Sequence, residues 1–148
     1  MSQMEKVEII TPLSKSEIKK YYQIRFDELR KAWRQPSGSE RDSIENQCIH
    51  RMIKMGEDYI GVSRLQYNTE SQAQIRYMAI KKKYQMKGFG KILIMDMESI
   101  ARENGIREII LQSRESAVQF YLNLNYKIID KTHLLFDEIQ HFLMRKYL

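Results

Sequence analysis

Several features are scarce in this chain of 148 residues, and each shortage narrows what the protein can be. The single cysteine, Cys48, excludes an internal disulfide and favours a reducing compartment, so we expect a cytoplasmic protein. Only two prolines and six glycines occur, with no low-complexity tract, which predicts one domain over residues 1–148. No apolar run approaches the roughly 18 residues of a membrane span, and the first residues lack a signal-peptide core. We therefore expect no membrane partner.

The chain is basic, with a formal net charge of +6, and a basic domain is a candidate for nucleic-acid binding. Its lysines and arginines are mostly interleaved with acids, and the one dense basic run is Lys81-Lys82-Lys83. The sequence shows neither aromatic side chains interleaved with that run nor a recognition helix rich in Arg and Asn. Nucleic-acid binding is therefore an alternative that the pattern does not favour. The run is either an ordinary solvated loop or a cationic funnel for a phosphorylated ligand.

A phosphate-binding turn is predicted directly after the lysine run. It lies between an alternating strand pattern in residues 74–80 and a helical pattern in residues 91–104. Gly88 and Gly90 let the backbone approach a ligand closely, and the free N–H groups of the first helical turn attract an anion. The spacing Gln85-x-x-Gly88-x-Gly90 is neither the dinucleotide fingerprint nor a Walker A loop. The alternative is a plain surface turn that opens a helix.

A second pattern follows at residues 114–126, where Ala117, Phe120 and Tyr121 are spaced as Ala-x-x-Phe-Tyr. Together the two patterns resemble the GCN5-related N-acetyltransferase (GNAT) superfamily. The glycine turn resembles its motif A, Gln/Arg-x-x-Gly-x-Gly/Ala, which holds the pyrophosphate of coenzyme A. The later pattern resembles the signature Asn-x-x-Ala-x-x-Phe-Tyr-x-x-x-Gly-Phe. The resemblance covers residues 74–126 well and the first half of the chain in outline.

The chain departs from that later signature at two positions. Asn125 replaces the usual Gly, a mild change because Asn tolerates the left-handed conformation that closes a helix. Arg114 replaces the usual Asn, which the family uses to bind the pantetheine arm of coenzyme A. These two departures leave open a second alternative, a protein of the same fold that binds coenzyme A as a sensor without turnover. Tyr126 is a fair replacement for the final Phe of the signature.

The resemblance implies an α+β fold of GNAT type, with a central, mostly antiparallel sheet of six to seven strands, splayed in the middle, and about four helices. Periodicity and turn residues predict elements in the same order. A capping box at Ser14 and Glu17 should open a helix that runs to Trp33, and Gly105 should end the helix after the glycine turn. The remaining expected elements are strands over residues 7–10, 48–55, 59–67, 72–80, 106–111, 126–130 and 141–147 and a helix over residues 115–123.

The resemblance also implies an activity. An acetyl-CoA-dependent N-acetyltransferase would move an acetyl group to a primary amine of a small molecule or peptide, by direct attack on the thioester. Acetyl-CoA would be the co-substrate, and the protein would be a monomer or a homodimer. The residues implied for acetyl-CoA binding are Met78, Ala79, Ile80, Gln85, Met86, Lys87, Gly88, Phe89, Gly90, Lys91, Ala117 and Tyr121.

Two of those residues receive catalytic roles from the resemblance. The backbone N–H of Met78, seven residues before Gln85, would stabilise the oxyanion of the tetrahedral intermediate. Tyr121 would protonate the departing thiolate, since its ordinary pKa near 10 keeps the hydroxyl protonated at neutral pH. Phe120 is expected to face the core and Tyr121 to face elsewhere, because neighbours on a helix lie about 100° apart. The alternative is that Tyr121 is a core aromatic.

Recognition of the acceptor amine is expected in the polar loop that follows the first helix. Trp33, Glu40, Asp42 and Glu45 supply aromatic and acidic groups there. Any of the three acids could be the general base, directly or through water, or could be an ordinary surface acid.

Thiol catalysis and metal binding are not favoured by the sequence. Cys48 and His50 share one face of a predicted strand, but no third group that would orient the histidine is evident. His133 and His141 do not stand at metal-ligand spacing with Cys48, so we expect no metal.

Overall fold

A computed structural model describes residues 6–148; the first five residues of the expected domain lie outside the described part. The described chain divides into two compact units. One contains the described residues up to Leu65 together with Tyr77–Met97, and the other contains Gln66–Arg76 and Glu98–Leu148.

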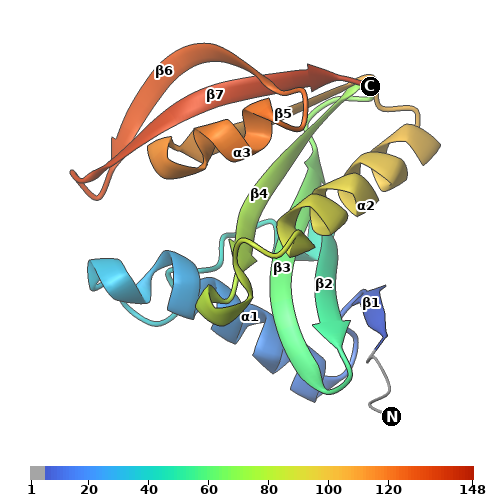
Figure 1. Cartoon of the computed structure of the whole chain (residues 1–148), viewed down its shortest axis with the longest axis vertical. Coiled ribbons are helices and arrows are strands. Elements are labelled where there is room, and N and C mark those ends of the chain that lie inside the picture. Colours follow the sequence, from blue (N-terminus) through green and yellow to red (C-terminus); the bar gives the residue numbers. More distant parts are fainter. Residues whose placement is uncertain (1–5) are drawn as a thin grey trace. The chain divides into compact units, whose positions relative to one another are not determined.

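The described residues form an α+β fold with seven strands and three α-helices (Figure 1). In chain order they are β1 (Val7–Ile10), α1 (Lys15–Leu29), β2 (Ile49–Met55), β3 (Asp58–Tyr67), β4 (Gln72–Ile80), α2 (Phe89–Glu103), β5 (Glu108–Arg114), α3 (Val118–Leu122), β6 (Lys127–Leu135) and β7 (Ile139–Tyr147). The strand order is β1-β2-β3-β4-β5-β7-β6. The predicted fold class is confirmed, with three α-helices in this part of the chain in place of about four.

The first helix begins at the predicted capping box. The Ser14 hydroxyl accepts from the Glu17 N–H at 3.1 Å, and the Glu17 carboxylate accepts from the Ser14 N–H at 3.1 Å. The helix ends at Leu29, however, and not at Trp33 as predicted. A 3₁₀ turn follows, and Arg34 adopts a left-handed φ of 57° two residues before Pro36. The α-helix already ends at Leu29 because the next residue, Arg30, has a φ of −129° and so leaves the helical conformation.

The core of the first unit lies on both faces of β2 and β3. Met52 and Val62 pack against Tyr21 and Ile24 of α1. Because side chains alternate along a strand, the neighbouring Ile53 and its partners point to the other face. There Ile53 and Ile60 pack with Tyr84 and with Leu93 of α2. Helix α1 and the start of α2 thus cover opposite faces of the strands (Figure 1).

Gly61 permits a close backbone approach inside the first unit. A Cβ atom at this position of β3 would lie 2.7 Å from the Ala79 carbonyl oxygen, closer than any real Cβ contact. Any larger side chain would therefore push β4 away from β3. The end of β4 is placed by this packing, and the predicted glycine turn starts from it.

In the second unit, β4 pairs with β5 in parallel over four residue pairs only, from Gln72/Glu108 to Ile75/Leu111. Strand β5 continues to Arg114 on its antiparallel pairing with β7. A short parallel pairing between these two strands is what the predicted splayed sheet requires.

The C-terminal hairpin is longer than predicted. Strands β6 and β7 meet at a tight turn in which Phe136 and Asp137 have φ angles of 53° and 58°. Two consecutive positive φ angles are typical of a type I′ hairpin turn. The turn was missed because neither residue is a glycine, so the predicted strands stopped at residue 130 and restarted at 141.

Candidate active site

The loop between β4 and α2 is fixed to the first unit at both ends. The Lys81 N–H donates to the Ile60 carbonyl at 2.9 Å, and the Gln85 side chain donates to the Ile80 carbonyl at 2.8 Å. Between them, residues Lys82–Tyr84 form a 3₁₀ turn. Its last residue, Tyr84, is buried and donates from its hydroxyl to the Asp58 carboxylate at 2.8 Å. The glycine turn therefore follows a firmly placed segment.

The predicted glycine turn opens α2. Gly88 has a φ of 89°, and within the described chain no atom other than those of Gly88 and its two neighbours lies within 4 Å of the position that a Cβ atom would occupy. The helix begins at Phe89, and the Ile92 N–H donates to the Gly88 carbonyl at 3.3 Å. The N–H groups of the first turn come before that bond and have no acceptor within the helix. An open space beside these donors suits the oxygens of a phosphate group.

Positive charge and exposed backbone surround this helix end. The side chains of Lys82, Lys83, Lys87 and Lys91 are exposed, and Met86, fully exposed, has a φ of 64°. Lysines on either side of a helix N-terminus add to the positive end of its dipole. The segment is thus built to attract an anion.

The three predicted residues at the end of β4 are held by the core. Met78 and Ile80 pack with the cluster around Ile53, and Ala79 is buried on the opposite face with Tyr21. Their side chains are committed to packing, so any contact that they make with a ligand goes through their backbone groups.

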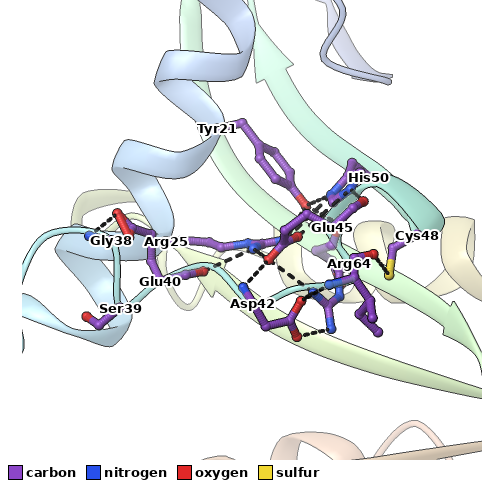
Figure 2. Close-up of polar contacts among 12 residues, drawn as sticks. Tyr21, Arg25, Gly38, Ser39, Glu40, Asp42, Glu45, Cys48, His50 and Arg64 are labelled. Atoms are coloured by element: carbon purple, nitrogen blue, oxygen red, sulfur yellow. Dashed lines mark hydrogen bonds and ion pairs between the residues drawn. The ribbon is translucent and has the colours of Figure 1, made fainter.

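A buried ionic network lies between α1, the following loop and β3 (Figure 2). The side chains of Arg25 and Arg64 are completely buried. One oxygen of Glu45, Oε2, accepts from Arg25 at 2.8 Å, from Arg64 at 3.0 Å and from the Asp42 N–H at 3.0 Å. Asp42 also accepts two hydrogen bonds of 2.8 Å from Arg64. Two arginines and two carboxylates therefore balance in charge.

This network keeps Glu45 ionised. Burial pushes the pKa of its carboxyl group upward, but Arg25, the Asp42 N–H and the charge of Arg64 together outweigh burial, so the pKa lies below the ordinary value. A carboxylate with a lowered pKa and three donors is a weak proton acceptor. Sequence analysis named Asp42 and Glu45 as candidate bases, and the structure shows both engaged with Arg25 and Arg64.

Sequence analysis did not identify the two arginines. The available signal was their position: Arg25 lies on the otherwise apolar stripe of α1, and Arg64 lies in a strand whose neighbours are buried. A charged side chain on a buried face needs a charged partner.

His50 and Cys48 lie beside the network, and neither is activated for catalysis. His50 Nδ1 lies 2.8 Å from the Tyr21 hydroxyl, and Nε2 lies 2.6 Å from the Glu45 carbonyl. These partners fit a neutral ring protonated at Nε2, and burial lowers the pKa of His50 in agreement. Burial raises the pKa of the Cys48 thiol, which donates to the Ile44 carbonyl at 3.2 Å. Neither group is arranged for nucleophilic catalysis.

A pocket of about 420 Å³ lies between α1 and the loop that follows it. Its walls include Lys19, Tyr22 and Phe26 of α1 and Glu40 and Arg41 of the loop. The Arg41 guanidinium group lies 3.7 Å from the centre of the Tyr22 ring. Glu40, 6% exposed, accepts from the Gly38 N–H through Oε1, whereas Oε2 has no hydrogen-bond partner among residues 6–148.

The predicted acceptor residues thus lie in three settings. Glu40 lines the pocket, Asp42 and Glu45 belong to the ionic network, and Trp33 ends the 3₁₀ turn after α1. The structure places all four in the first unit.

In the second unit, Tyr121 lies in the short helix α3. Its side chain is 7% exposed, and its ring packs edge to face on Phe120 at 4.9 Å and on Tyr126 at 5.8 Å. Burial raises the pKa of Tyr121 well above the ordinary value, against the opposing charge of Arg114, so the hydroxyl stays protonated. Ala117 directly precedes this helix.

The predicted orientation of Phe120 and Tyr121 is wrong: Tyr121 is the buried residue and Phe120 is only half-buried. Helix α3 has five residues and follows a 3₁₀ turn, so regular helical spacing does not hold over this segment. The expected left-handed Asn125 is confirmed, with a φ of 73°.

No helix in residues 6–148 is both long and apolar enough to cross a membrane. Over the same residues, no group of three or more His, Cys, Asp or Glu side chains is placed to hold a metal ion.

Comparison with known proteins agrees with this geometry. The model of the acetyltransferase (GNAT) family matches residues 18–126. YyaT, an uncharacterized protein of Bacillus subtilis, is 30% identical over 72% of this chain and 71% of its own. YjcF, an uncharacterized N-acetyltransferase of the same species, is 24% identical over 90% of this chain and 94% of its own.

Solved structures share the fold. A Bacillus subtilis acetyltransferase in complex with CoA superposes with a TM-score of 0.79 at 19% identity, covering 97% of this chain and 99% of that one. A GNAT family acetyltransferase from Elizabethkingia anophelis with acetyl-CoA bound gives a TM-score of 0.74 at 16% identity, covering 96% and 98%. With its glycine turn, its fold and the family match over most of its length, this chain belongs to the GNAT acetyltransferase family, a family of acyltransferase enzymes.

Proposed function

We propose that the protein is an acetyl-CoA-dependent N-acetyltransferase that acetylates a primary amine of a small molecule or peptide. The observation that carries the proposal is the open start of α2, where Gly88 leaves space beside the free N–H groups of the first helical turn. Such an end suits the pyrophosphate of CoA. The ligands in the two similar structures named above, CoA and acetyl-CoA, support the same choice.

Most of the proposed contacts with acetyl-CoA are made by backbone groups, and side chains contribute fewer. The N–H groups at the start of α2 would hold the pyrophosphate, with Gln85, Met86 and Lys87 forming the turn beside it. Strand residues 78–80, whose side chains are packed in the core, would pair through their backbone with the pantetheine amides. On the resemblance to the family, Ala117 and Tyr121 are also proposed as cofactor-binding residues.

The acceptor amine would enter by the pocket between α1 and the loop. Its aromatic walls, Tyr22 and Phe26, suit the carbon skeleton of an amine or the amine itself. The unpartnered Oε2 of Glu40 is an acceptor that an ammonium or N–H group would satisfy. Trp33, at the start of the same loop, would contribute to acceptor recognition.

The chemistry requires a neutral amine, a stabilised oxyanion and a protonated leaving group. The amine nitrogen would attack the acetyl carbonyl carbon, and the Met78 N–H would donate to the resulting oxyanion. Collapse of the intermediate would break the carbon–sulfur bond, and the Tyr121 hydroxyl would give its proton to the thiolate. Because Asp42 and Glu45 are engaged by arginines, Glu40 or a water molecule is the better candidate for removing the amine proton.

The domain organisation, compartment and oligomeric state of the protein are also proposals. We propose that residues 1–148 act as one acetyltransferase domain in the cytoplasm, as a monomer or a homodimer. A single cysteine is compatible with a reducing compartment.

A ligand-dependent melting experiment tests the proposal. At a hundredfold excess over its dissociation constant, CoA should stabilise the fold by about 2.7 kcal/mol. For a chain of this size that corresponds to a rise of roughly 5–10 °C in Tm. No shift with millimolar CoA, together with a shift on adding oligonucleotides, would favour the nucleic-acid alternative. A shift with CoA and no transfer to any amine would favour a sensor.

A further inference from the structure

The backbone of Tyr77 has an unusual conformation next to the proposed oxyanion donor. Tyr77 lies inside the extended strand β4, yet its φ is 53°. A bulky residue other than Gly rarely adopts a positive φ. Such a conformation persists only where the surrounding structure holds it, and it is common at functional sites.

Two buried arginines hold the Tyr77 side chain. The Arg25 guanidinium carbon lies 4.2 Å from the centre of the Tyr77 ring, and that of Arg64 lies 4.8 Å from it. Both distances lie within the range of cation–π attraction, which is stronger for groups shielded from water. The ring is therefore held by charges that cannot turn toward solvent, since both arginine side chains are completely buried.

The carboxylates of the ionic network fix the arginines in turn. Glu45 Oε2 binds both guanidinium groups, and Asp42 binds Arg64 through two parallel hydrogen bonds. Two parallel bonds fix the plane of a guanidinium group as well as its position. The carboxylates of the loop after α1 thus fix the two arginines, and the arginines in turn fix the Tyr77 ring.

The consequence concerns the next peptide group. The Met78 N–H belongs to the peptide that follows the Tyr77 Cα atom, so the Tyr77 torsion angles set its direction. On the other side, the Met78 and Ala79 side chains are packed in the two core clusters. We propose that Arg25, Arg64 and Tyr77 are positioning residues that aim the Met78 N–H at the oxyanion of the reaction.

This proposal rests on the proposed function, in which the Met78 N–H is the oxyanion donor. It assigns the ionic network a role beyond stability: the network sets how well a backbone donor is aligned, and alignment of such donors controls the rate of acyl transfer. Acetyl-CoA binding at the glycine turn should not depend on it.

The test replaces Tyr77, because removing one member of a buried ion pair leaves an uncompensated charge and endangers the fold. Tyr77→Phe keeps the ring face, and Tyr77→Leu removes it. We expect Tyr77→Leu to lower kcat at least about tenfold relative to Tyr77→Phe, as a misaligned oxyanion donor would. The KM for acetyl-CoA should be the same in both variants.

Two further variants make the test decisive. Replacing Tyr77 with 3,4,5-trifluorophenylalanine keeps the shape of Phe but weakens the negative ring face, so kcat should again fall relative to Tyr77→Phe. Tyr147→Leu is the matched control, because that ring also lies close to a cation, 4.7 Å from the Arg145 guanidinium carbon, but is exposed at the end of β7. Its kcat should stay at the wild-type value.

A readout without turnover separates this proposal from the proposed function. Amide hydrogen exchange at Met78 should be faster in Tyr77→Leu and in the trifluoro variant than in Tyr77→Phe. If the wild-type protein transfers no acetyl group, the proposed function fails. The exchange rates then still test whether Arg25, Arg64 and Tyr77 fix the Met78 N–H. Equal exchange rates and equal kcat across the Tyr77 series would overturn the proposal. So would a joint fall of kcat, acetyl-CoA affinity and Tm.

Discussion

The Tyr84 hydroxyl donates to the Asp58 carboxylate over 2.8 Å, and this bond ties the segment before the glycine turn to the start of β3. The Tyr84 ring also packs edge to face on Phe89, the first residue of α2, at 5.9 Å. One tyrosine thus fixes both sides of the turn that we assign to the pyrophosphate.

Replacing Tyr84 with Phe should weaken CoA binding. The ring packing remains, but the segment loses the bond that orders it before the ligand arrives, so binding must supply that order. Titration calorimetry should show a higher Kd for CoA. Tyr147→Phe, at an exposed position near the C-terminus, is the control. An unchanged Kd in Tyr84→Phe would show that the turn is ordered without the Asp58 contact.

Gly88→Ala should weaken CoA binding much more than a control substitution that costs the fold the same stability. The new methyl group would stand where phosphate oxygens approach the helix end. Gly105→Ala is a matched control, since Gly105 also has a positive φ, 77°, and open space around its missing side chain. Both variants should lose about 1–2 kcal/mol of stability from left-handed strain.

Only Gly88→Ala should also lose CoA affinity, by at least about tenfold, which is 1.4 kcal/mol. Calorimetric titration of both variants with CoA makes the comparison. Equal affinities would mean that the glycine turn serves the fold alone.

Tyr121→Phe should lower kcat while leaving CoA affinity and Tm nearly unchanged. The ring contacts with Phe120 and Tyr126 remain, and only the proton donor is lost. General acid catalysis typically contributes about 10²–10⁴-fold, and the fall in kcat should lie in that range. Steady-state kinetics with acetyl-CoA measures it.

Tyr126→Phe is the contrasting variant. Its hydroxyl donates to the buried Glu98 carboxylate at 2.8 Å, so its removal should cost about 1–3 kcal/mol of stability with little change in kcat. If Tyr121→Phe instead lost stability and kept its rate, Tyr121 would be a packing residue.

Stability should decline as the pH falls below about 6.5 because of His50. Its pKa in the folded protein is lower than the ordinary 6.5, since burial disfavours the charged ring, with Arg25 and Arg64 adding to the effect and Glu45 opposing it. Below pH 6.5 the unfolded chain therefore binds a proton that the folded chain resists, so the unfolded state gains. Above pH 6.5 the ring is neutral in both states.

Urea unfolding at a series of pH values measures this slope in the free energy of unfolding. His50→Gln removes the titrating group, so its slope between pH 6.5 and 5 should be shallower than that of the wild type. Identical slopes would show that His50 titrates normally in the folded protein.

The elements that were predicted well from the sequence depend on patterns among residues that are close together in the chain. Strands β1 and β4 match the predicted ranges to the residue, because alternation of side chains is visible over a few neighbours. The capping box at Ser14 and the helix-ending Gly105 were also predictable, since each depends on one or two residue types at fixed positions.

The features that could not be predicted are mainly contacts between residues that are distant in sequence. Nothing near Glu45 shows that Arg25 and Arg64, 20 and 19 positions away, will bind it, so a paired carboxylate looked like a free one. The turn at Phe136 and Asp137 uses positive φ angles without glycine, which no composition rule signals.

Acetyl transfer itself is the most direct test of the central claim. The purified protein is incubated with acetyl-CoA and a panel of small primary amines and peptides, and both free CoA thiol and acetylated amine are measured. We expect equal amounts of the two products for at least one amine, and a loss of both in Gly88→Ala. A protein that binds CoA in calorimetry but acetylates no amine in a broad panel would contradict it.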